Sequence, residues 1–198
     1  MACENCLGLI VISITCFIIA LILYRKYEEE RNQFTLYMVL FFLLAGAGWL
    51  FWFLSTDIVL NIYENVKGFL ILVGLIPQLV LLLFVLTFYE INILIRIGIT
   101  IGVILLTILH VFFPFLRLAT IVSTMIIISN IVLFVLNWRK NDDLKSLFFS
   151  VGLTLILIGE ALIFISRLIQ GIFLMITAII WLITYTSVLE YLKEKYVT

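Results

Sequence analysis

Long apolar runs separated by short polar breaks constrain the fold of this chain more than any other feature. A bilayer core about 30 Å thick is crossed by about 20 apolar residues in a helix. Lipid offers the backbone no hydrogen-bond partners, so such runs become helices. With 65% hydrophobic and 12% charged residues, little polar surface remains to cover a soluble globule. We therefore expect an all-α integral membrane protein, a single transmembrane helical domain over residues 1–198.

Seven runs have a length suited to crossing a bilayer. The least obvious break separates the fourth run from the fifth, and Pro114 and Arg117 mark it. Proline interrupts a helix and arginine is costly at the centre of a membrane, so this segment belongs at an interface. The seven predicted transmembrane helices span residues 7–24, 34–54, 68–88, 93–113, 118–138, 147–166 and 168–188.

The lysines and arginines predict the orientation of these helices. With the N-terminus outside, three of the 12 basic residues lie on the outer side: Lys67, Arg117 and Arg167. The nine on the cytoplasmic side are Arg25, Lys26, Arg31, Arg96, Arg139, Lys140, Lys145, Lys193 and Lys195. The positive-inside rule then favours an outer N-terminus, a cytoplasmic C-terminus and a location in the cell membrane. Glu4, and no basic residue, precedes the first run, which therefore does not resemble a cleavable signal.

Charge and motifs exclude several function classes. The formal net charge is zero and no basic stripe is present, which argues against nucleic-acid binding. We find no phosphate loop, zinc-ligand spacing or nucleophile motif, so we expect no cofactor, no metal and no catalytic residue, and an enzyme is disfavoured. The longest polar stretches are only 25–33 and 55–67. Any function therefore lies within the helix bundle or depends on a cytoplasmic or membrane protein partner.

Glu160 is the strongest candidate for a functional residue. It lies about 21 Å into the sixth run at 1.5 Å per residue, in the outer half of the bilayer. A carboxyl group there is costly unless it is protonated, paired or exposed to a wet cavity. Its candidate partners on the outer side are Arg167, Arg117, His110 and Lys67. A small-molecule ligand site and a simple tie between helices both remain open.

Other outer-side residues complete a candidate ligand pocket. His110 is the only histidine, and an interfacial hydrogen bond, pH sensing and ligand contact are all open for it. Glu64 and Lys67 are placed to close the outer end of the pocket. Trp49 and Trp52 would line it, although tryptophans near span ends also serve as interfacial anchors.

Proline, glycine and cysteine add local predictions. Pro77 and Gln78 lie midway along the third run and predict a kink, used for packing, in a substrate site or as a hinge. Small residues let helices approach closely, either inside the bundle or in a dimer. The glycines concerned are Gly46, Gly48, Gly98 and Gly102. Cys3 and Cys6 permit a disulfide or acylation, and Cys16 fits a core position.

An internal shift of 114 residues aligns two parts of the chain. It superposes 24–31 on 138–145 and 45–47 on 159–161. A true repeat would give a parallel three-plus-one-plus-three arrangement. The same basic and acidic residues after a span also follow from the positive-inside rule, so both interpretations stay open.

Residues 74–84, Gly-Leu-Ile-Pro-Gln-Leu-Val-Leu-Leu-Leu-Phe, are followed by Tyr89. This segment resembles the third helix of the seven-helix membrane domain that precedes sensor histidine kinases in many prokaryotes. Leu109 and His110 resemble the end of helix four in that family. Such proteins continue into kinase domains, whereas this sequence ends at Thr198. The resemblance therefore implies a free-standing sensor module that acts through a partner. Separately, the Ile-rich composition suggests a low-GC prokaryotic genome.

Two other functions remain as alternatives. Seven spans and a Pro-Gln pair resemble the proline-glutamine-loop and small sugar-exporter families, which implies a small-solute or lipid transporter. Those families carry the proline in the first helix of each repeat, whereas Pro77 lies in the third run. The second alternative is an intramembrane lipid-modifying enzyme with Glu160 and His110 as acid and base. A retinal pump is excluded, because the seventh run contains no lysine for a Schiff base.

Overall fold

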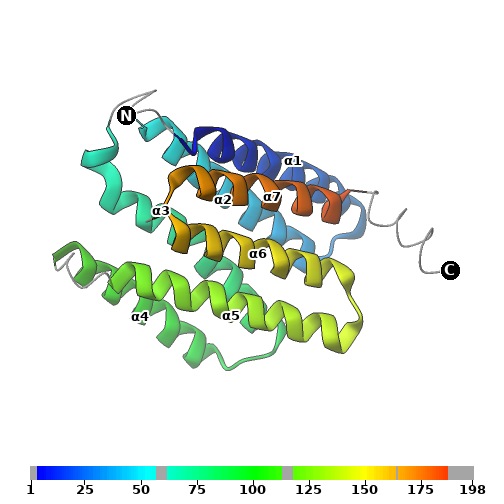
Figure 1. Cartoon of the computed structure of the whole chain (residues 1–198). Coiled ribbons are helices and arrows are strands. Elements are labelled where there is room, and N and C mark those ends of the chain that lie inside the picture. Colours follow the sequence, from blue (N-terminus) through cyan, green and yellow to red (C-terminus); the bar gives the residue numbers. More distant parts are fainter. Residues whose placement is uncertain (1–3, 57–61, 113–117, 164, 187–198) are drawn as a thin grey trace.

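The computed structural model contains seven α-helices, and no strand occurs in the ranges that it describes, 4–56, 62–112, 118–163 and 165–186 (Figure 1). The helices are α1 (Cys6–Glu30), α2 (Gln33–Ser55), α3 (Tyr63–Phe88), α4 (Ile93–Phe112), α5 (Leu118–Asn141), α6 (Leu144–Leu162) and α7 (Arg167–Tyr185). Six of them are long and apolar enough to cross a membrane. In α3 the described apolar stretch is shorter, Val73–Phe88. The chain is therefore a helical membrane protein.

Six helices form a closed ring and α4 lies outside it. Each ring helix contacts the next in the order α1, α2, α3, α5, α6, α7, and α7 returns to α1. In Figure 1, α1 and α7 lie side by side, and α4 is at the opposite edge of the bundle. Among the described residues, the fourth helix packs mainly against α3 and α5, and most of its apolar side chains are exposed. Its outer surface is suited to contact with lipid.

Polar caps move several helix ends away from the limits of the apolar runs. The first helix continues to Glu30 and ends where Arg31 adopts a positive φ of 53°. At the start of α6, Asp143 accepts hydrogen bonds from the backbone N–H groups of Lys145 and Ser146. This helix therefore begins at Leu144, three residues before the predicted run. Capping of this kind satisfies N–H groups that have no partner inside the helix.

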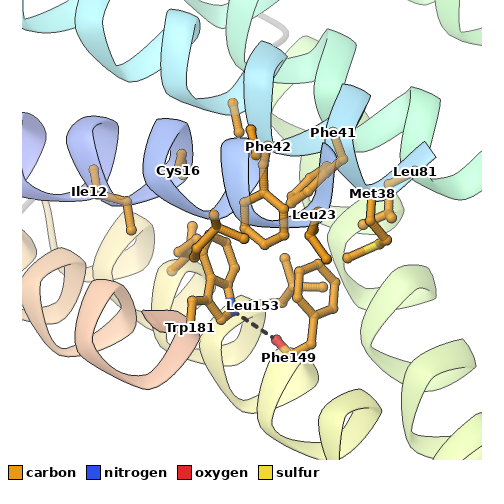
Figure 2. Close-up of a cluster of buried hydrophobic side chains, with 14 of the residues drawn as sticks. Ile12, Cys16, Leu23, Met38, Phe41, Phe42, Leu81, Phe149, Leu153 and Trp181 are labelled. Carbon is orange, nitrogen blue, oxygen red and sulfur yellow. Dashed lines mark hydrogen bonds between the residues drawn. The ribbon is translucent and has the colours of Figure 1, made fainter. Parts of the chain in front are cut away.

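The interior of the ring is filled by large aromatic side chains (Figure 2). Phe41, Phe42, Phe149 and Trp181 are all less than 2% exposed. The rings of Phe149 and Trp181 stack at a centroid distance of 5.3 Å. In addition, Trp181 Nε1 donates a hydrogen bond of 3.3 Å to the carbonyl oxygen of Phe149. Gly152 makes room for this indole, because an added Cβ would lie 2.7 Å from Trp181 Cδ1.

Candidate functional site

A chain of polar side chains links three helices at one end of the bundle. Glu160 is in the last turn of α6, Gln170 is in the first turn of α7, and Asn5 directly precedes α1. Gln170 Nε2 donates a long hydrogen bond of 3.4 Å to Glu160 Oε1. Asn5 Nδ2 donates a shorter one of 2.7 Å to Gln170 Oε1. We call Asn5, Gln170 and Glu160 the amide–carboxyl chain.

Burial differs along the amide–carboxyl chain. Gln170 is fully buried and Asn5 is 5% exposed, whereas Glu160 is only partly buried. Among the described residues, Glu160 Oε2 accepts no hydrogen bond. The carboxyl group therefore keeps an acceptor that is available to a donor from outside the chain, such as an amine or hydroxyl group.

Glycines allow these helices to approach closely enough for the polar contacts. An added Cβ on Gly8 would lie 2.6 Å from Gly171 Cα, and one on Gly171 would lie 3.1 Å from Asn5 Cα. Between α6 and α7, an added Cβ on Gly159 would lie 3.2 Å from Phe173 Cβ. Any larger residue at Gly8 would push α1 away from α7 and lengthen the bond between Asn5 and Gln170.

No described contact joins the other predicted members of the pocket to Glu160, and some of them lie outside the described residues. The rings of Trp49 and Trp52 stack at 5.6 Å, and both pack against the aromatic core. His110 is on α4, and its Nδ1 atom is buried without a partner among the described residues. Arg167 begins α7 and is exposed. Arg117 and the side chains of Glu64 and Lys67 lie outside the described part of the chain.

Among the described residues, no direct hydrogen bond joins Glu160 and His110, the acid and base of the enzyme alternative. The described contact of the Glu160 carboxyl group is with Gln170. His110 belongs to α4, which packs against α3 and α5, whereas Glu160 faces α7. Nor does any group of three His, Cys, Asp or Glu residues suited to a metal occur in the described ranges.

A second polar contact lies beside the proline in α3. Pro77 is inside the helix, and the carbonyl oxygen of Gln78 accepts a hydrogen bond of 3.1 Å from Asn130 Nδ2 on α5. Both side chains are buried, Asn130 completely. Within the described structure, Gln78 Oε1 and Asn130 Oδ1 have no hydrogen-bond partner. The hydrogen bond between α3 and α5 is therefore made by the side chain of Asn130, and Gln78 contributes its backbone carbonyl oxygen.

The glycines and cysteines occupy distinct environments. An added Cβ on Gly46 would lie 3.2 Å from Cys16 Cβ, and one on Gly48 would lie 3.3 Å from Val73 Cγ1, so both are at helix contacts. Around Gly98 and Gly102 no atom of the described residues lies within 4 Å of an added Cβ, so this pair has no such contact in that part of the chain.

Two of the three cysteines lie in the described ranges. Cys6 is disulfide-bonded and Cys16 is free and buried, while Cys3 is outside those ranges.

Sequence reasoning missed Asn5, Gln170 and Asn130. Two of them carried a visible signal, because Gln170 and Asn130 are amides inside predicted apolar runs, where a polar side chain needs a partner. Asn5 gave no such signal, since it precedes the first run. Comparison of the chain with protein-family models, with curated proteins and with solved structures found no match.

Proposed function

We propose that the chain crosses the cell membrane seven times, with its N-terminus outside and its C-terminus in the cytoplasm. The third helix has 26 residues and is about 39 Å long, which exceeds the bilayer core. Successive helices joined by short turns then alternate in direction, and seven of the nine basic residues assigned to the cytoplasm gather at one end; the other two, Lys193 and Lys195, lie outside the described residues. The positive-inside rule assigns that end to the cytoplasm. The amide–carboxyl chain lies at the other end, in the outer half of the bilayer.

In this orientation, the protein is a small-ligand-binding sensor module that acts through a protein partner. The observation that carries this function is the amide–carboxyl chain, in which a partly exposed carboxyl group connects through a buried amide to a third helix. A ligand that donates to the open Oε2 atom of Glu160 draws on the same carboxyl group as Gln170 and thereby competes with its long hydrogen bond to Oε1. Such competition would alter how α7 sits against α1, and α7 leads directly into the cytoplasmic tail. The tail itself lies outside the described residues.

The filled interior of the ring favours a binding module over a transporter whose path runs through the centre of the bundle. Four aromatic side chains occupy the middle of the bundle and leave less than 2% of their surface exposed. A solute moving through the ring would have to displace them. A sensor needs only a small change at the helix ends, so the packed core favours this role.

Ligand-dependent thermal stability in detergent tests the sensor function. Metabolites and lipids carrying amine or hydroxyl groups are screened against the wild type, Glu160→Gln and Glu4→Gln. Glu4 is an exposed acid near the same helix end, so it is a matched control. A ligand at a hundredfold excess over its Kd stabilises the native state by about 2.7 kcal/mol. We expect stabilisation of the wild type and Glu4→Gln but not of Glu160→Gln; equal stabilisation of all three would rule out this site.

The order of the ring favours a second candidate, a small-solute or lipid transporter. Helices α1 to α3 form one half of the ring, α5 to α7 form the other, and α4 lies outside. The contact of α1 with α7 corresponds to that of α5 with α3 if the halves are related by a twofold axis. Parallel repeats of this kind are a common design of transporters. Arg31 and Asp142 share a positive φ between paired helices, but Glu90 does as well, so this turn is not specific to a repeat.

Proteoliposomes distinguish the transporter from the sensor. A ligand that stabilises the purified protein is enclosed in the vesicles, and its exchange is followed in the wild type and in Glu160→Gln. Exchange that is lost in the variant would assign transport. Binding without exchange, together with recovery of a cytoplasmic partner after gentle solubilisation, would assign sensing.

A further inference from the structure

An apolar groove lies between α3 and α4, at the end of the bundle opposite the amide–carboxyl chain. It has a volume of about 290 Å³ and opens to the outside of the bundle. Four of its seven lining residues are leucine or isoleucine, and the other three are threonine or arginine. The groove is lined by Leu83, Thr87, Ile93, Arg96, Ile97, Thr100 and Ile101.

Arg96 gives this groove an uncompensated positive charge. One guanidinium nitrogen, Nη1, donates to Thr87 Oγ1, and the buried Nε has no hydrogen-bond partner among the described residues. Within the described residues, no carboxylate forms an ion pair with Arg96. The groove also faces the first turn of α4, which begins at Ile93, and a helix N-terminus carries a partial positive charge. Arg96 is partly buried, and such a cation without a counterion favours an anionic partner.

We propose that this groove binds an anionic phospholipid of the cytoplasmic leaflet. The phosphate of the headgroup accepts hydrogen bonds from the guanidinium of Arg96, which suits phosphate geometry. An acyl chain then runs along Ile97 and Ile101, which line the groove and are about half exposed. Basic pockets between transmembrane helices on the cytoplasmic side are typical sites for anionic lipids.

The lining favours a lipid over a free phosphate ion. Thr87 and Arg96 are at the end of the groove near the turn between α3 and α4, whereas Ile97 and Ile101, with Thr100 between them, continue along α4 toward the centre of the bilayer. Two of those polar groups are already used, because Thr87 and Thr100 donate their hydroxyl hydrogens to the carbonyl oxygens of Leu83 and Arg96. A free ion would therefore find one strong donor group and an apolar wall. A phospholipid matches both parts.

Native mass spectrometry of the purified protein tests the lipid site. Phosphatidylglycerol, phosphatidylcholine and inorganic phosphate are titrated against the wild type, Arg96→Gln and the control Arg139→Gln. Arg139 is an exposed arginine at the same end of the bundle, outside the groove. We expect phosphatidylglycerol to bind the wild type and Arg139→Gln, and to bind Arg96→Gln at least about tenfold more weakly. Equal binding of phosphatidylglycerol to all three proteins would overturn the proposal.

A second variant keeps the test valid if Arg96→Gln does not fold. Ile101→Trp fills the apolar wall and leaves the guanidinium in place, and it changes a side chain that is 52% exposed. It should weaken phosphatidylglycerol binding. Unchanged lipid binding in Ile101→Trp, or inorganic phosphate that competes as well as phosphatidylglycerol, would show a site for a free anion and contradict the lipid assignment.

Discussion

Asn5 and Gln170 are 165 residues apart in the sequence, yet their side chains form a 2.7 Å hydrogen bond that joins the first helix of the ring to the last. The bond closes the contact between α1 and α7. It lies where Gly8 and Gly171 bring the two backbones together. The same amide of Gln170 contacts Glu160, so the closure of the ring and the candidate site share one residue.

Replacing Gln170 by leucine should destabilise the protein by about 1 to 2 kcal/mol. Leucine fills a similar volume but cannot form the two hydrogen bonds. It removes the acceptor Oε1 from the buried Asn5 amide and the donor Nε2 from Glu160. Thermal unfolding in detergent measures the effect. Gln33→Leu is the matched control, because Gln33 is exposed at the start of α2. If both variants unfold at the wild-type temperature, the amide of Gln170 does not hold α7 to α1.

Glycine substitutions separate close helix contacts from open surfaces. Gly8→Ala should destabilise the fold by about 1 to 3 kcal/mol, because the new Cβ would overlap the backbone of Gly171. Gly98→Ala should leave stability unchanged or raise it by up to about 1 kcal/mol, since no atom is near and alanine favours a helix. Thermal unfolding of the two variants side by side checks the pair. A loss of stability in Gly98→Ala that depends on protein concentration would instead indicate a dimer face.

Hydropathy predicted the number and approximate position of the helices, because each apolar run must satisfy its backbone in lipid. The ends were less predictable. The first helix extends beyond its apolar run to Glu30, through charged residues that include an ion pair of 3.5 Å between Lys26 and Glu30. Similarly, α6 starts at its Asp143 cap. Hydropathy measures preference for lipid and is insensitive to helical turns that continue into water.

The sequence predicted one residue of the candidate site, Glu160, but not its partners Gln170 and Asn5. Glu160 was identified because a carboxyl group inside an apolar run is costly. Charged partners were expected for it, but the structure pairs it with the neutral amide of Gln170. That pairing depends on which helices are neighbours and how each is rotated. The sequence did not specify a ring in which α7 returns to α1 and α4 is excluded.

Changing Asn130 to aspartate should destabilise the bundle by at least about 2 kcal/mol. The carboxyl group would replace the amide donor to the Gln78 carbonyl oxygen and place a fully buried acid in the apolar interior. Asn141→Asp, at the exposed end of the same helix, should cost less than about 1 kcal/mol. Thermal unfolding compares the two, and equal effects would mean that the contact between α3 and α5 at Pro77 contributes little.

Epitope tags on the two termini decide between seven spans and six. The nine-to-three division of basic residues predicts that an N-terminal tag is labelled on intact cells, and that a C-terminal tag is labelled only after permeabilisation. Both tags are placed on the same protein, so each is the expression control for the other. An even number of spans would put both termini on one side, and both tags would then be labelled under the same condition. That result would remove α3 from the spanning helices, because it has the shortest described apolar stretch, Val73–Phe88, and, with the N-terminus outside, would move Arg96 to the outer side and Glu160 to the cytoplasmic side.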